Sequence, residues 1–138
     1  MEVTRKTDLA TRALVQLASS AQRTKASELA SALDASPGFL AQALTPLVSR
    51  GWVRSDPGPT GGYTAVVDLE DVSVLDVIEA VEGTTDATAC VLEDRLCGGG
   101  GKHCALHDAW SKARSHLLLE LAATPLSTVR ASSGGSFG

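Results

Sequence analysis

The chain has 138 residues, which is enough for one compact domain or one domain with an extension. Hydrophobic residues make up 43% of the chain and aromatic residues only 4%, so its core must be aliphatic, which favours helices. No apolar run reaches the ~18 residues of a membrane span, and the N-terminal segment does not have the pattern of a signal peptide. We therefore expect a cytoplasmic protein with reduced thiols and no membrane partner.

The net charge of −4 is distributed unevenly along the chain. Residues 1–66 contain seven Lys or Arg and five Asp or Glu, whereas residues 67–138 contain five and eleven. The first part is therefore weakly basic, with a net charge of +2, and the second part is acidic, with −6. A small basic excess is compatible with a nucleic-acid partner, but it predicts only modest non-specific affinity.

The first part of the chain has the pattern of a helix-turn-helix. Apolar residues recur at helical spacing over residues 4–20, 24–33 and 37–50, and a tight turn separates the last two segments. The predicted N-caps are Thr4 for the first helix, Thr24 or Ser27 for the second, and Ser36 for the third. Pro46 should kink the third helix or shorten its regular part.

A β-hairpin is predicted directly after the third helix. Residues 52–54 and 63–67 have the pattern of extended segments, and the tip between them, residues 56–62, is rich in Pro and Gly. A hairpin in this position is typical of a wing, although an ordinary surface hairpin has the same local pattern. We predict a mostly α fold with a small β-hairpin, in which residues 1–83 form a winged helix-turn-helix DNA-binding domain.

Two further helices are predicted after the hairpin. Ser73 and Asp76 form a capping box at the start of a helix that ends at Gly83. Residues 105–124 carry an apolar stripe wider than a small core requires, so we predict a dimerisation helix; a purely intrachain role is the alternative. The stripe consists of Leu106, Trp110, Ala113, Leu117 and Leu121. Residues 125–138 are predicted to form a flexible tail.

Every cysteine of the chain lies in one loop, residues 84–104. These are Cys90, Cys97 and Cys104, and His107 follows three positions later. Thiolates and an imidazole are ligands for a metal, but the six-residue gaps are wider than the gaps of most zinc sites. Four glycines, residues 98–101, let the backbone bend and approach closely, which favours an iron–sulfur cluster. Unrelated thiols are the alternative; a disulfide is disfavoured because three is an odd number.

Four motifs occur together in this chain. The third helix contains Phe39-Leu40-x-Gln42, the wing Gly58-Pro59-x-Gly61-Gly62-Tyr63, the fourth helix Asp76-Val77-Ile78-x-Ala80-Val81-Glu82-Gly83, and the cysteine loop leads into His107-Asp108-Ala109-Trp110. With them the chain resembles, over residues 1–122, the Rrf-type winged-helix regulators, which include IscR-like and NsrR-like members. The resemblance implies a homodimeric DNA-binding repressor or activator whose iron–sulfur cluster sets its affinity for DNA. The expected signal is iron, redox state or nitric oxide, and we favour a repressor.

Three features depart from the family pattern. Ala41 stands where IscR-like proteins carry an acidic residue that reads bases, and Pro57 stands where an arginine commonly enters the minor groove. These two departures leave the operator sequence open. Both gaps between cysteines are slightly longer than in the best-known members, which leaves open whether the cluster is 2Fe–2S or 4Fe–4S.

The expected partner is a double-stranded DNA operator with an imperfect inverted repeat, because a two-fold dimer presents two recognition helices. Ser36, Gln42 and Thr45 are predicted to reach base edges from the third helix. Lys25, Arg50 and Arg54 are predicted to hold phosphates. Gly61, Gly62 and Tyr63 complete the predicted DNA-binding set from the wing.

The fourth cluster ligand has two main candidates. His107 lies one helical turn beyond Cys104, as in the IscR-like pattern, and local ligation restricts less chain entropy. Asp8 resembles the aspartate that, in NsrR-like members, reaches the cluster from the other subunit. His103 is a weaker third candidate because its neighbour Cys104 constrains it. We favour His107.

A second functional hypothesis keeps the fold and discards the cluster. In it the three cysteines are redox-active thiols, or the chain senses a small ligand, and it still regulates transcription. An enzyme or electron carrier is disfavoured, because the sequence has no nucleotide-binding Gly motif after a strand and no acid/base pair in an identifiable cleft.

Overall fold

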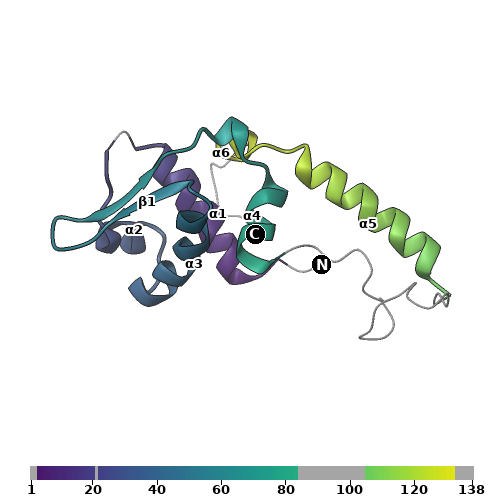
Figure 1. The fold of residues 1–138 in the computed structure, drawn as a ribbon, viewed down its shortest axis with the longest axis horizontal. Coiled ribbons are helices and arrows are strands. Elements are labelled where there is room, and N and C mark those ends of the chain that lie inside the picture. Colours follow the sequence, from purple (N-terminus) through teal and green to yellow (C-terminus); the bar gives the residue numbers. More distant parts are fainter. Residues whose placement is uncertain (1–2, 21, 84–104, 133–138) are drawn as a thin grey trace.

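The computed structural model describes residues 3–20, 22–83 and 105–132, so the predicted cysteine loop, residues 84–104, lies outside the described residues. The elements are α1 (Arg5–Ala18), α2 (Ala26–Ala32), α3 (Pro37–Ser49), β1 (Val53–Asp56), β2 (Gly62–Ala65), a 3₁₀ helix η1 (Leu69–Asp71), α4 (Val74–Glu82), α5 (His107–Ala122) and α6 (Leu126–Ser132), in that order (Figure 1). The mostly helical fold with one two-stranded hairpin confirms the predicted fold class.

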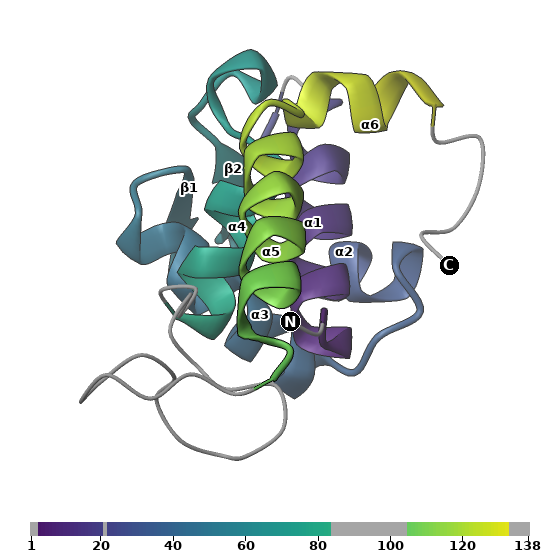
Figure 2. The ribbon, with the colours of Figure 1, turned by 90° about the vertical axis from the view of Figure 1, so that its right-hand side faces the viewer.

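The core is aliphatic and forms around α1, which packs against both α3 and α4. Figure 2 shows α1 in the middle of the molecule, behind α5. The fully buried large side chains are Leu14, Leu17, Leu29, Leu40, Leu44, Leu47, Leu126, Val72 and Val77. Burying one such leucine contributes roughly 1.5–3 kcal/mol, so these residues account for the main stabilisation of the domain.

The caps of α1 and α3 confirm two predictions. The Thr4 side chain accepts a hydrogen bond from the Thr7 backbone N–H at 3.2 Å, and the Ser36 side chain accepts one from the Phe39 N–H at 3.2 Å. Thr7 is also the buried polar residue of the described core, and its hydroxyl donates to the Glu82 carboxylate. This bond ties the first turn of α1 to the last residue of α4.

The predicted cap of α2 is wrong, because neither Thr24 nor Ser27 occupies that position. Lys25 is the N-cap residue, and it makes no side-chain capping bond. Thr24 is held outside the helix by the hairpin: its N–H donates to the Tyr63 carbonyl at 2.9 Å, and its carbonyl accepts from the Tyr63 N–H at 2.8 Å. The start of α2 is therefore set by contact with β2 rather than by local capping.

Pro46 does not shorten α3, which continues through it to Ser49. Proline removes the N–H that would bond to the Gln42 carbonyl, but the helix resumes at once, since the Arg50 N–H donates to the Pro46 carbonyl at 3.0 Å. The turn before α3 contains Asp34 at a φ of 52°, a left-handed conformation that Asp tolerates better than most residues.

The hairpin follows α3 without a long connection. β1 and β2 are antiparallel, with Val53 opposite Ala65 and Asp56 opposite Gly62. The Trp52 N–H donates to the Leu47 carbonyl at 3.0 Å, which fixes the start of the hairpin against the end of α3. This is the arrangement predicted from the sequence, although β1 continues to Asp56 rather than ending at Arg54.

The capping box of α4 is also confirmed. The Ser73 side chain accepts from the Asp76 N–H at 3.0 Å, and the Asp76 carboxylate accepts from the Ser73 N–H at 2.9 Å. Gly83, at a φ of 90°, ends the helix.

The predicted flexible tail, residues 125–138, is wrong for its first part, because residues 126–132 form α6. Leu126 is completely buried, and its N–H donates to the Val72 carbonyl at 2.9 Å. The Val74 N–H in turn donates to the Thr124 carbonyl at 2.9 Å. One buried leucine and these backbone bonds hold the segment against the start of α4; the rest of the predicted tail, residues 133–138, lies outside the described residues.

α5 differs from the other long helices because none of its residues is buried. Figure 1 shows it leaving the body of the molecule, with its C-terminal end near α6 and its N-terminal end pointing away. Its large exposed apolar residues are Leu106 just before it, Trp110, Leu117 and Leu119. None of the helices in the described segments is long and apolar enough to cross a membrane.

Candidate nucleic-acid interface

The helix α3 has one face in the core and the opposite face in solvent. Its buried residues are Leu40, Ala43, Leu44 and Leu47, and its exposed residues include Ala41, Gln42 and Thr45. Two of the predicted base-reading residues, Gln42 and Thr45, therefore lie on the solvent side of the second helix of a helix-turn-helix. This position is the one from which a recognition helix enters a major groove.

The hydroxyl groups on α3 are partly used inside the helix. The Thr45 hydroxyl donates to the Ala41 carbonyl at 2.8 Å, so toward a base it retains its acceptor capacity. Ser36 accepts the capping bond described above, so it retains its donor. The Gln42 amide is exposed and offers a donor and an acceptor together, which suits bidentate contact with adenine.

Packing within the domain requires glycine at positions 61 and 62 of the wing. A Cβ on Gly61 would overlap the Asp56 carbonyl oxygen, and a Cβ on Gly62 would overlap the Thr24 carbonyl oxygen. Gly62 also has a φ of 151°, which disfavours any side chain. Both glycines are buried, so what they contribute to the predicted surface is the path of the backbone.

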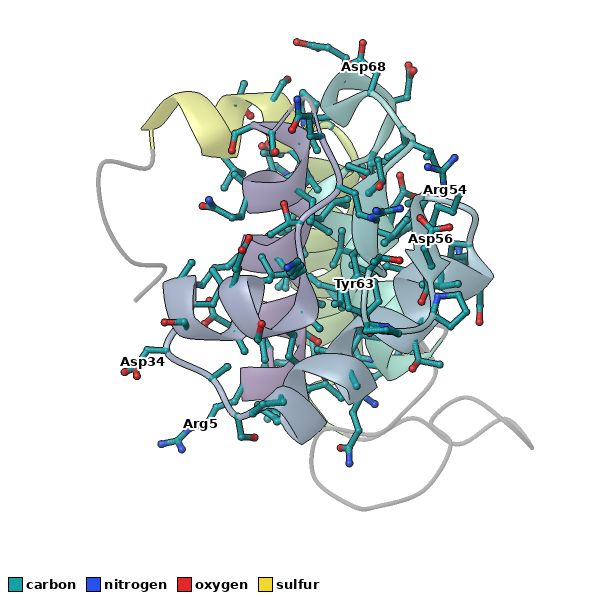
Figure 3. All side chains as sticks on the ribbon, turned by 90° about the vertical axis from the view of Figure 1, so that its left-hand side faces the viewer. Arg5, Asp34, Arg54, Asp56, Tyr63 and Asp68 are labelled. Carbon is teal, nitrogen blue, oxygen red and sulfur yellow. The ribbon has the colours of Figure 1, made fainter. Side chains whose placement is uncertain are left out.

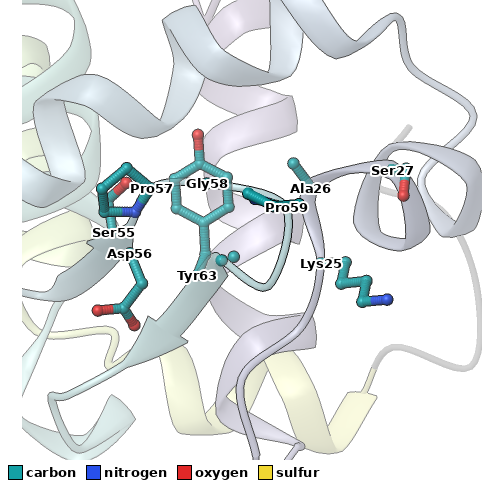
Figure 4. Close-up of a pocket in the computed structure, with 11 residues that line it drawn as sticks. Lys25, Ala26, Ser27, Ser55, Asp56, Pro57, Gly58, Pro59 and Tyr63 are labelled. Carbon is teal, nitrogen blue, oxygen red and sulfur yellow. The ribbon is translucent and has the colours of Figure 1, made fainter.

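Tyr63 and Lys25 meet at one pocket between the hairpin and the start of α2. The pocket has a volume of about 340 Å³, and Gly61 and Gly62 also line it. Figure 4 shows the Tyr63 ring at its centre, with Pro57 on one side and Pro59 on the other, while the Lys25 side chain extends away from the ring. The structure thus brings four of the predicted residues together on the face that carries the wing.

Arg50 and Arg54 are both exposed but have different surroundings. Arg50 is the C-cap of α3, and its guanidinium lies 5.7 Å from the centroid of the Trp52 ring. The Arg54 Nε lies 3.5 Å from the Asp56 Oδ2, and Figure 3 shows these two side chains near Tyr63. Arg54, predicted to hold a phosphate, is therefore paired with a carboxylate within the domain.

Sequence reasoning missed Arg23. Its Nη1 lies 3.8 Å from the same Asp56 oxygen that Arg54 approaches. Arg23 precedes α2 in a segment without periodicity, so no local pattern marks it. The signal that places it is the Thr24–Tyr63 bridge, which joins two segments far apart in the sequence.

The candidate cluster ligands are only partly described. Cys90, Cys97 and Cys104 lie outside the described residues, and the described ones contain no group of three or more potential metal ligands. His107 is the first residue of α5 and is partly exposed. Asp8 lies in the first turn of α1, with its Oδ2 3.8 Å from Nη1 of Arg12.

The two candidates for the fourth ligand are separated within one chain. Figure 1 shows the N-terminal end of α5, which carries His107, well away from the N-terminal end of α1, which carries Asp8. Within a single copy the two first turns are therefore not in contact.

An exposed recognition helix, a hairpin bonded to the start of α2 and a long helix leaving the body together define a winged helix-turn-helix protein. The profile of the Rrf2 family, described as "Iron-dependent Transcriptional regulator", matches residues 3–131. The chain belongs to the Rrf2 family and is a DNA-binding transcriptional regulator rather than an enzyme.

Comparison with individual proteins agrees with this assignment. An HTH-type transcriptional regulator of Mycobacterium tuberculosis is 33% identical over 131 residues, which cover 94% of this chain and 81% of that protein. The HTH-type transcriptional regulator IscR of Vibrio atlanticus is 35% identical over 79 residues, 57% of this chain and 44% of IscR. The solved structure of CymR, the global cysteine regulator of B. subtilis, has the same fold, with a TM-score of 0.77 at 21% identity, covering 96% of this chain and 98% of CymR.

Proposed function

We propose that this regulator is a homodimeric repressor whose affinity for its operator is set by an iron–sulfur cluster. The observation that carries the proposal is a combination: a DNA-binding domain of the Rrf2 family, followed by a segment that holds all three cysteines and ends three residues before His107. The similarity to IscR, an HTH-type regulator of the same family, supports the choice of cofactor.

The DNA side of the proposal rests on the exposed face of α3 and on the wing. Gln42, Thr45 and Ser36 would contact base edges, each with the hydrogen-bonding capacity that the helix leaves free. Lys25, Arg50 and Arg54 would contact phosphates, which position the domain without reading sequence. Gly61 and Gly62 would set the backbone path of the wing, and Tyr63 would contact the DNA beside them.

The donor set fits an iron–sulfur cluster. Three cysteine thiolates supply three of the usual four ligands, and a histidine can replace a thiolate on such clusters. Cys90, Cys97, Cys104 and His107 would hold it, with Asp8 as the alternative fourth ligand. The cluster, of the 2Fe–2S or 4Fe–4S type, would supply chemistry that responds to iron supply, oxidants or nitric oxide.

The link from cluster to DNA would run through α5. His107 opens this helix, and Trp110 and Leu117 on it are 40% and 43% exposed and line one mostly apolar hollow together with Ala113. A second copy packing on this face would bury them. A change in the cluster-binding segment would then alter how the two DNA-binding domains face each other.

The test is anaerobic purification followed by absorption and resonance Raman spectroscopy. A brown protein with iron–sulfur vibrational bands supports the proposal. A colourless protein that binds its operator fully would overturn the cluster and favour a regulator that senses through its thiols or a small ligand.

A further inference from the structure

Three charged side chains meet beside the turn of the wing. Asp56 is the last residue of β1, Arg54 lies two residues earlier on the same strand, and Arg23 comes from the segment before α2. The Asp56 Oδ2 lies 3.5 Å from the Arg54 Nε and 3.8 Å from the Arg23 Nη1. One carboxylate oxygen thus lies between two guanidinium groups that come from distant parts of the sequence.

The backbone brings these residues together. The two hydrogen bonds between Thr24 and Tyr63 attach the segment before α2 to β2 like a short third strand. Asp56 pairs with Gly62 across the hairpin, and the Cγ of Arg23 lies 3.0 Å from where a Cβ on Gly62 would stand. The stem of Arg23 therefore runs over a glycine, which has no side chain to displace it.

The three groups differ in exposure. The Asp56 Oδ2 is buried and accepts no hydrogen bond within the described residues. The Arg23 and Arg54 side chains are 45% and 62% exposed, against 34% for Asp56. The carboxylate oxygen is therefore shielded from solvent, and the two guanidinium groups lie closer to the surface than it does. A buried carboxylate oxygen is unfavourable unless it is compensated, and here the two guanidinium groups compensate it as ion pairs.

We propose that Asp56 is a positioning residue that holds Arg23 and Arg54 side by side as a clamp for the DNA backbone. This assigns Arg23 to the DNA-binding surface, and it rests on the proposed DNA-binding role of the wing. An arginine has five N–H donors in a planar fork, so it can face a carboxylate with one edge and a phosphate with another. Fixing both side chains before binding reduces the rotamer entropy that is lost when the DNA arrives.

The positioning role and the charge of Asp56 alone predict opposite changes in DNA affinity when Asp56 is substituted. Asp56→Asn removes a negative charge from a DNA-binding face, and charge alone would strengthen binding. If Asp56 positions the arginines, the same substitution weakens binding, because both side chains lose their fixed orientation. The sign of the change therefore separates the two effects.

The test uses the full chain and a short fluorescent duplex of random sequence, because phosphate contacts do not require the operator. Anisotropy titrations over a range of salt concentrations should give Asp56→Asn about two- to fivefold weaker binding than wild type. The matched control is Glu70→Gln in η1, which changes the net charge equally away from the wing and should bind as wild type does or slightly more tightly. Far-ultraviolet circular dichroism and thermal unfolding establish that each variant is folded.

A double-mutant cycle completes the test. Arg23→Ala should lower the salt dependence by about one phosphate contact, whereas Gln22→Ala beside it should not. Adding Asp56→Asn to the Arg23→Ala, Arg54→Ala double variant should no longer weaken binding. The proposal requires this lower salt dependence, so the Arg23 result can overturn it even if Asp56→Asn fails to fold.

Two negative results have different meanings. If the wild-type chain does not bind the duplex, the DNA-binding role of the wing is wrong. If wild type binds but Asp56→Asn binds equally or more tightly, or Arg23→Ala leaves the salt dependence unchanged, the positioning role is wrong and DNA binding stands.

Discussion

Gly62 occupies a conformation and a space that admit no side chain. Its φ of 151° disfavours L-residues, and a Cβ there would overlap the Thr24 carbonyl oxygen, which accepts one of the two bonds that attach α2 to the wing. We therefore expect Gly62→Ala to destabilise the domain by about 1–3 kcal/mol, the range for strained backbone. Chemical denaturation followed by circular dichroism measures this.

Gly38 is the matched control because it lies in the first turn of α3, and no atom beyond its own stretch of helix lies within 4 Å of where its Cβ would stand. Gly38→Ala should stabilise the domain by roughly 0.4–1 kcal/mol, since alanine loses less backbone entropy in a helix. Two Gly→Ala substitutions should thus shift the denaturation midpoint in opposite directions. Equal destabilisation by both would contradict the packing reason given for Gly62.

Also at the residue scale, substitutions of His107 and Asp8 should have different effects on the spectra of the cluster. We expect His107→Ala, reconstituted without oxygen, to change the absorption and electron paramagnetic resonance spectra, and Asp8→Ala to leave them unchanged. The reason is that His107 follows Cys104 closely in sequence, whereas Asp8 is far from all three cysteines in sequence. The Asp8 Oδ2 also lies 3.8 Å from the Arg12 Nη1. His116→Ala, which removes an exposed histidine from the same helix, is the control.

The reverse pattern would identify Asp8 as the ligand. Asp8 would then be the ligand that the NsrR-like pattern supplies from the second copy. A carboxylate is a hard ligand that suits iron–sulfur iron poorly, so nitric oxide would then become the leading signal.

At the scale of elements, apolar periodicity and capping residues predicted the helices that have local caps or one apolar face. Thr4, Ser36 and Ser73 each cap the helix expected of them, because a cap and the N–H it accepts from lie within one turn. The hairpin was predictable for the same reason, since turn residues and extended segments are adjacent in the sequence. These signals were enough to place the exposed face of α3.

The elements that the sequence did not predict depend on contacts between distant segments. α6 forms where Leu126 enters a core built from other elements, and the Ser-rich sequence around it suggested a tail. Lys25 begins α2 because Thr24 bonds to Tyr63. Arg23 joins Asp56 through the same contact. No window of neighbouring residues contains this information.

At the scale of elements, the testable prediction concerns α5, through which we expect the dimer to form. We expect Leu117→Glu to yield monomers, because Leu117 lies with Trp110 and Ala113 on an apolar hollow of the helix, and an unpaired charge at an apolar interface is costly. Ser115→Glu adds the same charge at an exposed position about half a turn away and should leave the dimer intact. Sedimentation velocity measures both; a Leu117→Glu protein that sediments as wild type does would contradict dimerisation through this face.

At the scale of the whole molecule, the two proposed surfaces lie at opposite ends. Figure 1 shows α2, α3 and the hairpin on one side and the free end of α5 on the other. Residues 1–66, which contain the DNA-binding elements, are weakly basic, and residues 67–138, which contain α5, are acidic. A dimer formed through α5 would therefore keep both basic domains free, and its two recognition helices would match an operator with two half-sites.

In such a dimer, substitutions of phosphate-contacting and base-contacting residues should affect DNA binding differently. We expect Arg54→Ala to weaken binding to all sequences alike and to reduce the salt dependence by about one phosphate contact per domain, because phosphates carry no sequence information. Gln42→Ala should instead relax the preference at one base pair in each half-site, because the exposed amide on α3 is placed to read an adenine edge. Competition binding against a randomised operator library, at two salt concentrations, measures both effects. If both variants lose affinity uniformly across the library, α3 does not read bases through Gln42.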